Sequence, residues 1–148
     1  MKKFSKILAV LLTICLTLTL AACSSYGKVE KAFKDAGYSV TESALIQQYE
    51  KAGEEYGVKA HYLEKQETLA KLGVIILEFK ATDDMIEYYN NNEMIRDVIS
   101  AITSSEDAQE FYNTLVEVGF ANGNCLVFPA NTAATLAINS ILQITKNA

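Results

Sequence analysis

The stretch Gly73–Lys80, GVIILEFK, limits the possible folds of this chain more than any other part of its sequence. Successive side chains of a strand point to opposite faces of the sheet. One face of this segment carries Val74 and Ile76, and the other carries Ile75, Leu77 and Phe79. Both faces are apolar, which is typical of a strand that is covered on both sides. We predict that helices cover at least part of both faces of the sheet that contains it.

Three glycines mark places where a helical pattern ends and an apolar residue follows. They are found in Ala36-Gly37-Tyr38, Tyr56-Gly57-Val58 and Val118-Gly119-Phe120. Glycine takes the left-handed conformation at the end of a helix at low cost, and the next apolar side chain can fold back onto the last turn. No GxGxxG or Walker pattern surrounds them, which disfavours a phosphate-binding loop. We predict three helix ends, each of which leads into a strand.

The hydrophobic patterns between these glycines predict the order of the elements. Strands are expected at Tyr38–Glu42, Val58–Leu63, Gly73–Lys80 and Cys125–Phe128. The first two expected helices are Val29–Ala36 and a helix that Ser43 caps and that ends at Tyr56. Thr82 caps the next one, and two segments with apolar stripes follow at 95–102 and 108–115. The last expected helix is Thr132–Thr145, which Asn131 caps. Asn122-Gly123 is expected to form a turn.

From residue 38 to residue 128 the predicted order is β-α-β-β-α-β, with the second α split into segments. This order is similar to the ferredoxin-like superfold, which implies an antiparallel sheet with helices on one face. Helices before residue 38 and after residue 128 would cover part of the second face. We therefore expect an α+β domain with a ferredoxin-like βαββαβ sheet and additional N- and C-terminal helices. That superfold carries many unrelated functions, so it indicates no particular activity.

The first 22 residues have the layout of a secretory signal peptide. Lys2, Lys3 and Lys6 precede an apolar run of 16 residues, Ile7 to Ala22. A positive start, a short apolar middle and small residues at the exit are typical of such leaders. The run is short for the ~30 Å hydrocarbon core of a bilayer, which disfavours a permanent transmembrane helix.

The exit of this leader, Leu20-Ala21-Ala22-Cys23, resembles the lipobox of bacterial lipoproteins, and the resemblance covers the first 23 residues. It implies cleavage between Ala22 and Cys23 and attachment of a diacylglyceryl group to the sulfur of Cys23. Two acyl chains hold a protein stably at a membrane, whereas one is marginal. We expect a cleaved signal peptide (1–22), a lipidated cysteine with a short tether (23–27) and a single α+β domain (28–148), anchored at the extracytoplasmic face of the cell membrane. No family resemblance is found for the mature domain.

Composition limits the partners of the mature chain. Removal of the leader leaves 126 residues, the size of one domain, and changes the formal net charge from −5 to −8, because three lysines leave with it. Net acidity without a basic cluster argues against a nucleic-acid partner and against flat docking on anionic lipid. Cys15 leaves with the leader and Cys23 carries lipid, so Cys125 has no partner for a disulfide.

Few residues offer a basis for catalysis. His61, the only histidine, and Cys125 could act as base and nucleophile. Strand alternation puts His61 on the face opposite Ala60 and Tyr62, where a structural role is the simpler interpretation. Cys125 lies in an apolar strand, which favours a small buried side chain. One histidine and one unmodified thiol cannot form a zinc cluster.

Acidic residues gather at two helix starts. They are Asp83, Asp84 and Glu87, and then Glu106, Asp107 and Glu110. No loop has the calcium-binding pattern of alternating acids with a central glycine, and stabilisation of the helix dipole explains these acids more simply. A carboxylate pair for glycoside hydrolysis stays open, because the sequence does not show their separation. Tyr88 and Tyr89, with the asparagines after them, could contact a sugar or peptide or could pack in the core.

We therefore expect one modification site, lipid attachment at Cys23, and no catalytic, cofactor or metal site. The favoured function is a small lipid-anchored binding or accessory module, whose partner is an envelope protein or a small ligand near the membrane. One alternative is an envelope-associated hydrolase that uses carboxylates or a His61/Cys125 pair. Another is an inhibitor or immunity-type protein that covers its partner with an acidic face.

Overall fold

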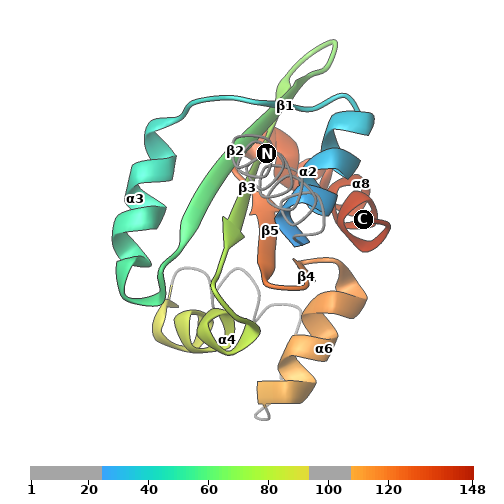
Figure 1. Cartoon of the computed structure of the whole chain (residues 1–148). Helices are drawn as coiled ribbons and strands as arrows, with labels where there is room; N and C mark the ends of the chain where they lie inside the picture. The colour runs from blue at the N-terminus through green and yellow to red at the C-terminus, as the bar shows by residue number, and fades with distance from the viewer. Residues whose placement is uncertain (1–24, 94–107) are drawn as a thin grey trace, which may run out of the picture.

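A long antiparallel hairpin forms the centre of the sheet. In a computed structural model, which describes residues 25–93 and 108–148, β2 (Lys59–Gln66) pairs with β3 (Lys71–Glu78) along the whole length of both strands (Figure 1). Lys59 faces Glu78 at one end of the hairpin, and Gln66 faces Lys71 at the other. The apolar segment at 73–80 therefore lies mostly in a central strand, as the sequence predicts.

Three shorter strands complete an antiparallel sheet. β1 (Ser39–Val40) pairs with β2, β5 (Cys125–Pro129) pairs with β3, and β4 (Ala121–Asn122) pairs with β5. The order across the sheet is β1-β2-β3-β5-β4. The class is α+β, as predicted.

The ferredoxin-like topology is not confirmed, because the strand order differs. A split βαβ unit has another strand between its two strands. Here the first two predicted strands, β1 and β2, are direct antiparallel neighbours. The residues of β1 explain its position: Ser39 and Val40 are both exposed, which suits a short strand at the edge of the sheet.

Helices cover both faces of the sheet. The first face is covered by α3 (Ala44–Ala52), the 3₁₀ helix η1 (Glu54–Tyr56), α4 (Thr82–Asn91) and α6 (Ala108–Val118). The second face is covered by α2 (Ser25–Asp35), α7 (Thr132–Leu136) and α8 (Ile138–Lys146). α8 also reaches the edge of the first core through Leu142, whereas its Ile141 lies in the second.

The two faces of β3 belong to two separate cores, as the sequence predicts. Ile75 and Leu77 are fully buried in the first core, where Met85 and Tyr88 of α4 and Leu115 of α6 cover them. Val74 and Ile76 are fully buried in the second core, beneath Val29 and Phe33 of α2. Burial of this many large apolar side chains, at about 25 cal/mol per Å², is the main source of stability of the described domain, in which Cys125 is a free thiol.

The three predicted helix ends are confirmed. Gly37, Gly57 and Gly119 have φ values of +93°, +63° and +101°. The constraint is tightest at Gly119, where a Cβ would collide with the backbone of α8 at Leu142. The amide of Phe120 then donates to the carbonyl of Leu115 at 2.9 Å, which closes the last turn of α6.

Several predicted boundaries differ from the structure. α2 begins at Ser25 rather than Val29, so Ser25–Gly27 are helical although a tether was predicted there. The helix expected from Ser43 to Tyr56 divides at Gly53 into α3 and η1, and the one expected over Thr132–Thr145 divides at Ala137.

The predicted caps are confirmed in two of three helices. The side chains of Ser43 and Asn131 accept hydrogen bonds from the amides of Leu45 and Ala134. Thr82 is instead the first residue of α4, and Ala81 occupies the cap position without a side-chain bond. The apolar stripe expected at 95–102 lies outside the described residues.

Candidate functional site

The first turn of α2 packs on one end of the sheet and brings side chains from several elements together. The Tyr26 ring stacks on the His61 ring of β2, with centroids 3.7 Å apart and an angle of 18° between the planes. Ser25 lies against the turn between β4 and β5, so closely that a Cβ on Gly123 would collide with its hydroxyl. Val29 and Phe33, both 0% exposed, then hold the rest of the helix on the second core.

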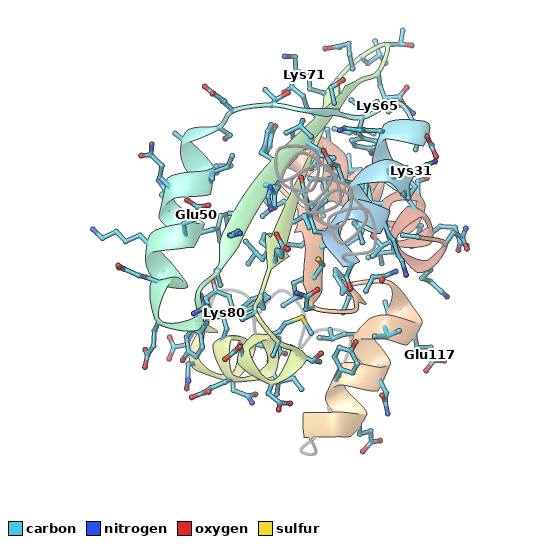
Figure 2. All side chains as sticks on the ribbon, in the orientation of Figure 1. Lys31, Glu50, Lys65, Lys71, Lys80 and Glu117 are labelled. Atoms are coloured by element: carbon cyan, nitrogen blue, oxygen red, sulfur yellow. The ribbon has the colours of Figure 1, made fainter. Side chains whose placement is uncertain are left out.

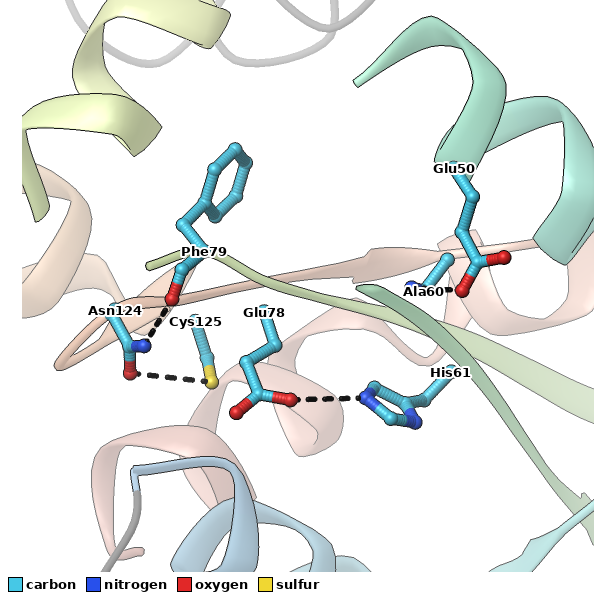
Figure 3. Close-up of polar contacts among 7 residues, drawn as sticks. All are labelled: Glu50, Ala60, His61, Glu78, Phe79, Asn124 and Cys125. Atoms are coloured by element: carbon cyan, nitrogen blue, oxygen red, sulfur yellow. Dashed lines mark hydrogen bonds and ion pairs between the residues drawn. The ribbon is translucent and has the colours of Figure 1, made fainter. Parts of the chain in front are cut away.

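His61 pairs with a carboxylate. Its Nε2 lies 3.3 Å from Oε2 of Glu78 on β3 (Figure 3). The two side chains are 24% and 23% exposed, which places the pair at the margin of the second core. The strand register explains the contact: Glu78 faces Lys59, so Glu78 and His61 are diagonal neighbours on one face of the sheet.

The thiol of Cys125 lies on the other side of Glu78. Cys125 faces Glu78 across the β3–β5 pair and is 0% exposed. Its Sγ lies 4.0 Å from Oδ1 of Asn124, whose amide donates to the carbonyl of Phe79. Burial, with a smaller contribution from the Glu78 carboxylate, raises the pKa of Cys125 to about 12. Figure 3 shows the Glu78 carboxylate between the thiol and the imidazole.

This arrangement does not form the nucleophile and base that the sequence offered as an alternative. The thiolate is the reactive form of cysteine, and a thiol with a pKa near 12 stays protonated at neutral pH. Nε2 of the imidazole is directed to the Glu78 carboxylate and not to the thiol. His61 and Cys125 thus share one face of the sheet, as strand alternation allows, but the carboxylate separates them.

Two members of this cluster, Glu78 and Tyr26, were not predicted. Glu78 is the single acid in GVIILEFK, and an acid in an otherwise apolar strand is a signal that could have been noticed. Its pairing with His61 depends on the strand register, which the sequence does not give. Tyr26 falls in the predicted tether, but in the structure it belongs to α2 and stacks on His61. Burial and the nearby Glu30 and Glu78 carboxylates raise the pKa of its phenol.

The acidic helix starts and the tyrosines can also be placed. Asp83, Asp84 and Glu87 lie in the first two turns of α4, and Glu110 in α6, whereas Glu106 and Asp107 lie outside the described residues. Within residues 25–93 and 108–148, no group of three His, Cys, Asp or Glu side chains could hold a metal ion. Tyr88 and Tyr89, 1% and 5% exposed, pack in the first core and do not form an exposed contact patch.

A shallow depression opens beside the cluster. Its lining consists of Gly57, Lys59, Glu78, Phe79, Lys80 and Asn124. Lys59 and Lys80 are exposed, and the Lys80 side chain lies over Gly57. Two exposed lysines beside a carboxylate in a shallow depression do not define a ligand.

Cys23 and the leader lie outside the described residues, so lipid attachment stays a prediction. Within the described part of the chain, every helix is too short or too polar to cross a bilayer. Searches of protein-family models, curated proteins and solved structures found no match to this chain.

Proposed function

We propose that the protein is a lipid-anchored binding or accessory module at the extracytoplasmic face of the cell membrane. The observation that carries this proposal is the sequence Leu20-Ala21-Ala22-Cys23 after a basic and then apolar leader. The folded domain supports it, because α2 begins at Ser25, only two residues after the proposed lipid attachment site. An anchor at Cys23 would keep the domain next to the membrane, where it could contact envelope proteins or ligands close to the bilayer.

The geometry of the sheet disfavours one form of the hydrolase alternative, the His61/Cys125 pair. The one histidine is paired with Glu78, and the thiol of Cys125 is buried and protonated at neutral pH. No observation on the described residues favours the hydrolase alternative.

Acyl labelling with membrane fractionation tests the anchor. In bacteria grown with an alkyne analogue of palmitate, the wild-type protein should incorporate the label and sediment with membranes. Cys23→Ser removes the only sulfur at the proposed site and should abolish labelling. Cys15→Ser is the matched control, because it changes a cysteine within the leader and should label as the wild type does. Equal labelling of Cys23→Ser and the wild type would overturn the proposal.

A further inference from the structure

The charged side chains of the helices are divided unequally between the two faces of the sheet. α2, α7 and α8, which we call the second-face layer, carry Lys28, Lys31, Lys34 and Lys146 against Glu30 and Asp35, a net charge of +2. The first-face layer, α3, η1, α4 and α6, carries Lys51 against eight acids, a net charge of −7. These acids are Glu50, Glu54, Glu55, Asp83, Asp84, Glu87, Glu110 and Glu117. Most of the acidity of the described helices thus lies on one side of the molecule.

The proposed anchor joins the domain on the less acidic side. Cys23 precedes Ser25 by two residues, and at 3.8 Å between consecutive Cα atoms the two Cα positions lie within about 8 Å of each other. Ser25 is not free to swing away, because it packs against Gly123 and the next residue, Tyr26, stacks on His61. The acyl chains would therefore enter the bilayer beside the start of α2.

We propose that the second-face layer lies against anionic phospholipid headgroups and that the first-face layer points away from the bilayer. This inference rests on the proposed lipid anchor. Figure 2 shows Lys31 on α2 and Glu50 on α3 on opposite sides of the central strands. Turning the domain over would bring a layer of net charge −7 toward a negative surface.

The charge orients the domain and does not hold it at the membrane. Lys31 pairs with Asp35 and Lys34 pairs with Glu30, each at 2.6 Å, which weakens their attraction to lipid. Attraction by a net charge of +2 is therefore modest, and repulsion of the opposite layer is the larger effect. The attraction and the repulsion both decay over a Debye length, about 8 Å at physiological ionic strength. They can orient the domain only because the short connection to Cys23 keeps it that close to the bilayer.

Fluorescence quenching by lipid tests this orientation. The mature protein, purified with its lipid from bacterial membranes, is reconstituted in phosphatidylglycerol vesicles that contain a nitroxide-headgroup lipid. A neutral thiol-reactive fluorophore is placed at Lys31→Cys on α2 or at Lys51→Cys on α3. Both lysines are exposed and both substitutions remove one positive charge, so the variants are matched. Cys125 is buried and protonated at neutral pH and should not compete for the label.

We expect several-fold stronger quenching at position 31 than at position 51. The contrast should fall in high salt and in phosphatidylcholine vesicles. It should also fall in Lys28→Glu, which reverses an exposed charge of the second-face layer. It should not fall in the control Lys71→Glu, because strand alternation puts Lys71 on the same face of β3 as Ile75 and Leu77, which lie in the first core. Equal quenching at both positions in vesicle-bound protein would overturn the orientation alone. Protein that fails to remain with the vesicles would instead overturn the proposed anchor.

Discussion

The residue that most restricts the chemistry of this protein is Cys125. Its thiol is fully buried in the second core, beneath α2, and the Glu78 carboxylate lies between it and His61. A buried thiol behaves as a small apolar side chain, and desolvation opposes its ionisation. We therefore assign Cys125 to packing.

Cys125→Ala should destabilise the protein by about 1 kcal/mol at neutral pH, because it leaves a cavity of one sulfur atom. Urea denaturation of the wild type and the variant measures this difference. A bulky maleimide should label the native thiol no faster than the protein opens. Rapid labelling of the folded protein would contradict burial and revive a reactive cysteine.

The difference in stability between the wild type and Cys125→Ala should depend on pH in the alkaline range. The folded-state pKa of about 12 lies above the ordinary thiol value of 9.0. Between these values the unfolded chain loses the thiol proton and the folded chain keeps it. The contribution of the Cys125 thiol to the stability of the wild type is therefore fully present below about pH 9, and it falls as the pH rises, by up to ~1.4 kcal/mol per pH unit. Tyrosines titrate in both proteins, so the difference between them isolates Cys125. The deficit of Cys125→Ala should shrink and vanish near about pH 10, and a constant deficit would contradict the raised pKa.

At the scale of the elements, the docking of α2 depends on one glycine outside the helix. Gly123 has a φ of +58° in the β4–β5 turn, and the Ser25 side chain lies where its Cβ would be. The hydroxyl of Tyr112 donates to the carbonyl of Gly123 at 2.9 Å, which ties the turn to α6 as well. One turn thus fixes the start of a helix that is nearly a hundred residues away in sequence.

Gly123→Ala should destabilise the fold by roughly 2 kcal/mol or more, since a left-handed alanine costs about 1–2 kcal/mol and the new methyl group also displaces Ser25. Ser25→Gly should relieve only the collision. The double variant Ser25→Gly/Gly123→Ala should therefore recover part of the loss in a urea titration, and Ser25→Gly alone serves as the control. Full additivity of the two single changes would show that the residues do not interact.

The sequence predicted local structure better than it predicted topology. The three glycine helix ends, the two-sided strand and the caps at Ser43 and Asn131 depend on neighbouring residues and are confirmed. The strand order depends on contacts between distant segments. The pattern at Tyr38–Glu42 gave no information on which strand it would join, and it forms only a two-residue edge strand.

The same division applies to the candidate site. Burial of Cys125 and the face of His61 follow from strand alternation, which is a local property. The contacts of His61 with Glu78 and Tyr26 depend on strand register and on the position at which α2 begins. The helical pattern suggested a start at Val29, because Tyr26 and Gly27 are weak helix formers; packing on His61 and Gly123 overrides that preference.

For the whole molecule, the length of the proposed tether limits which partners the domain can reach. If the protein binds a partner near the membrane, its effective concentration depends on how closely the anchor confines it. The structure shortens the proposed tether, because Ser25–Gly27 belong to α2.

Insertion of about 20 Gly/Ser residues after Ser24 should let the domain reach roughly 25 Å further without altering its fold. We expect the yield of a membrane-proximal partner, crosslinked in intact cells, to fall. Thermal unfolding of the two proteins checks that the domain is unchanged. His61→Ala should leave that yield near the wild-type level. The hydrolase alternative would be favoured if the insertion left the crosslinking yield unchanged and if His61→Ala folded normally but lost the function of the protein in cells.

The position of Ser25 also bears on the order of events during maturation. A peptidase that cuts before Cys23 must bind an extended segment around the bond, and proteolysis of folded chains generally waits for local opening. Ser25, two residues beyond Cys23, begins a helix whose first turn is packed on His61 and Gly123. Cleavage and the docking of α2 would then compete for the same residues. A chain that is processed while still unfolded would mature quickly, and one that folds first would wait for α2 to fray.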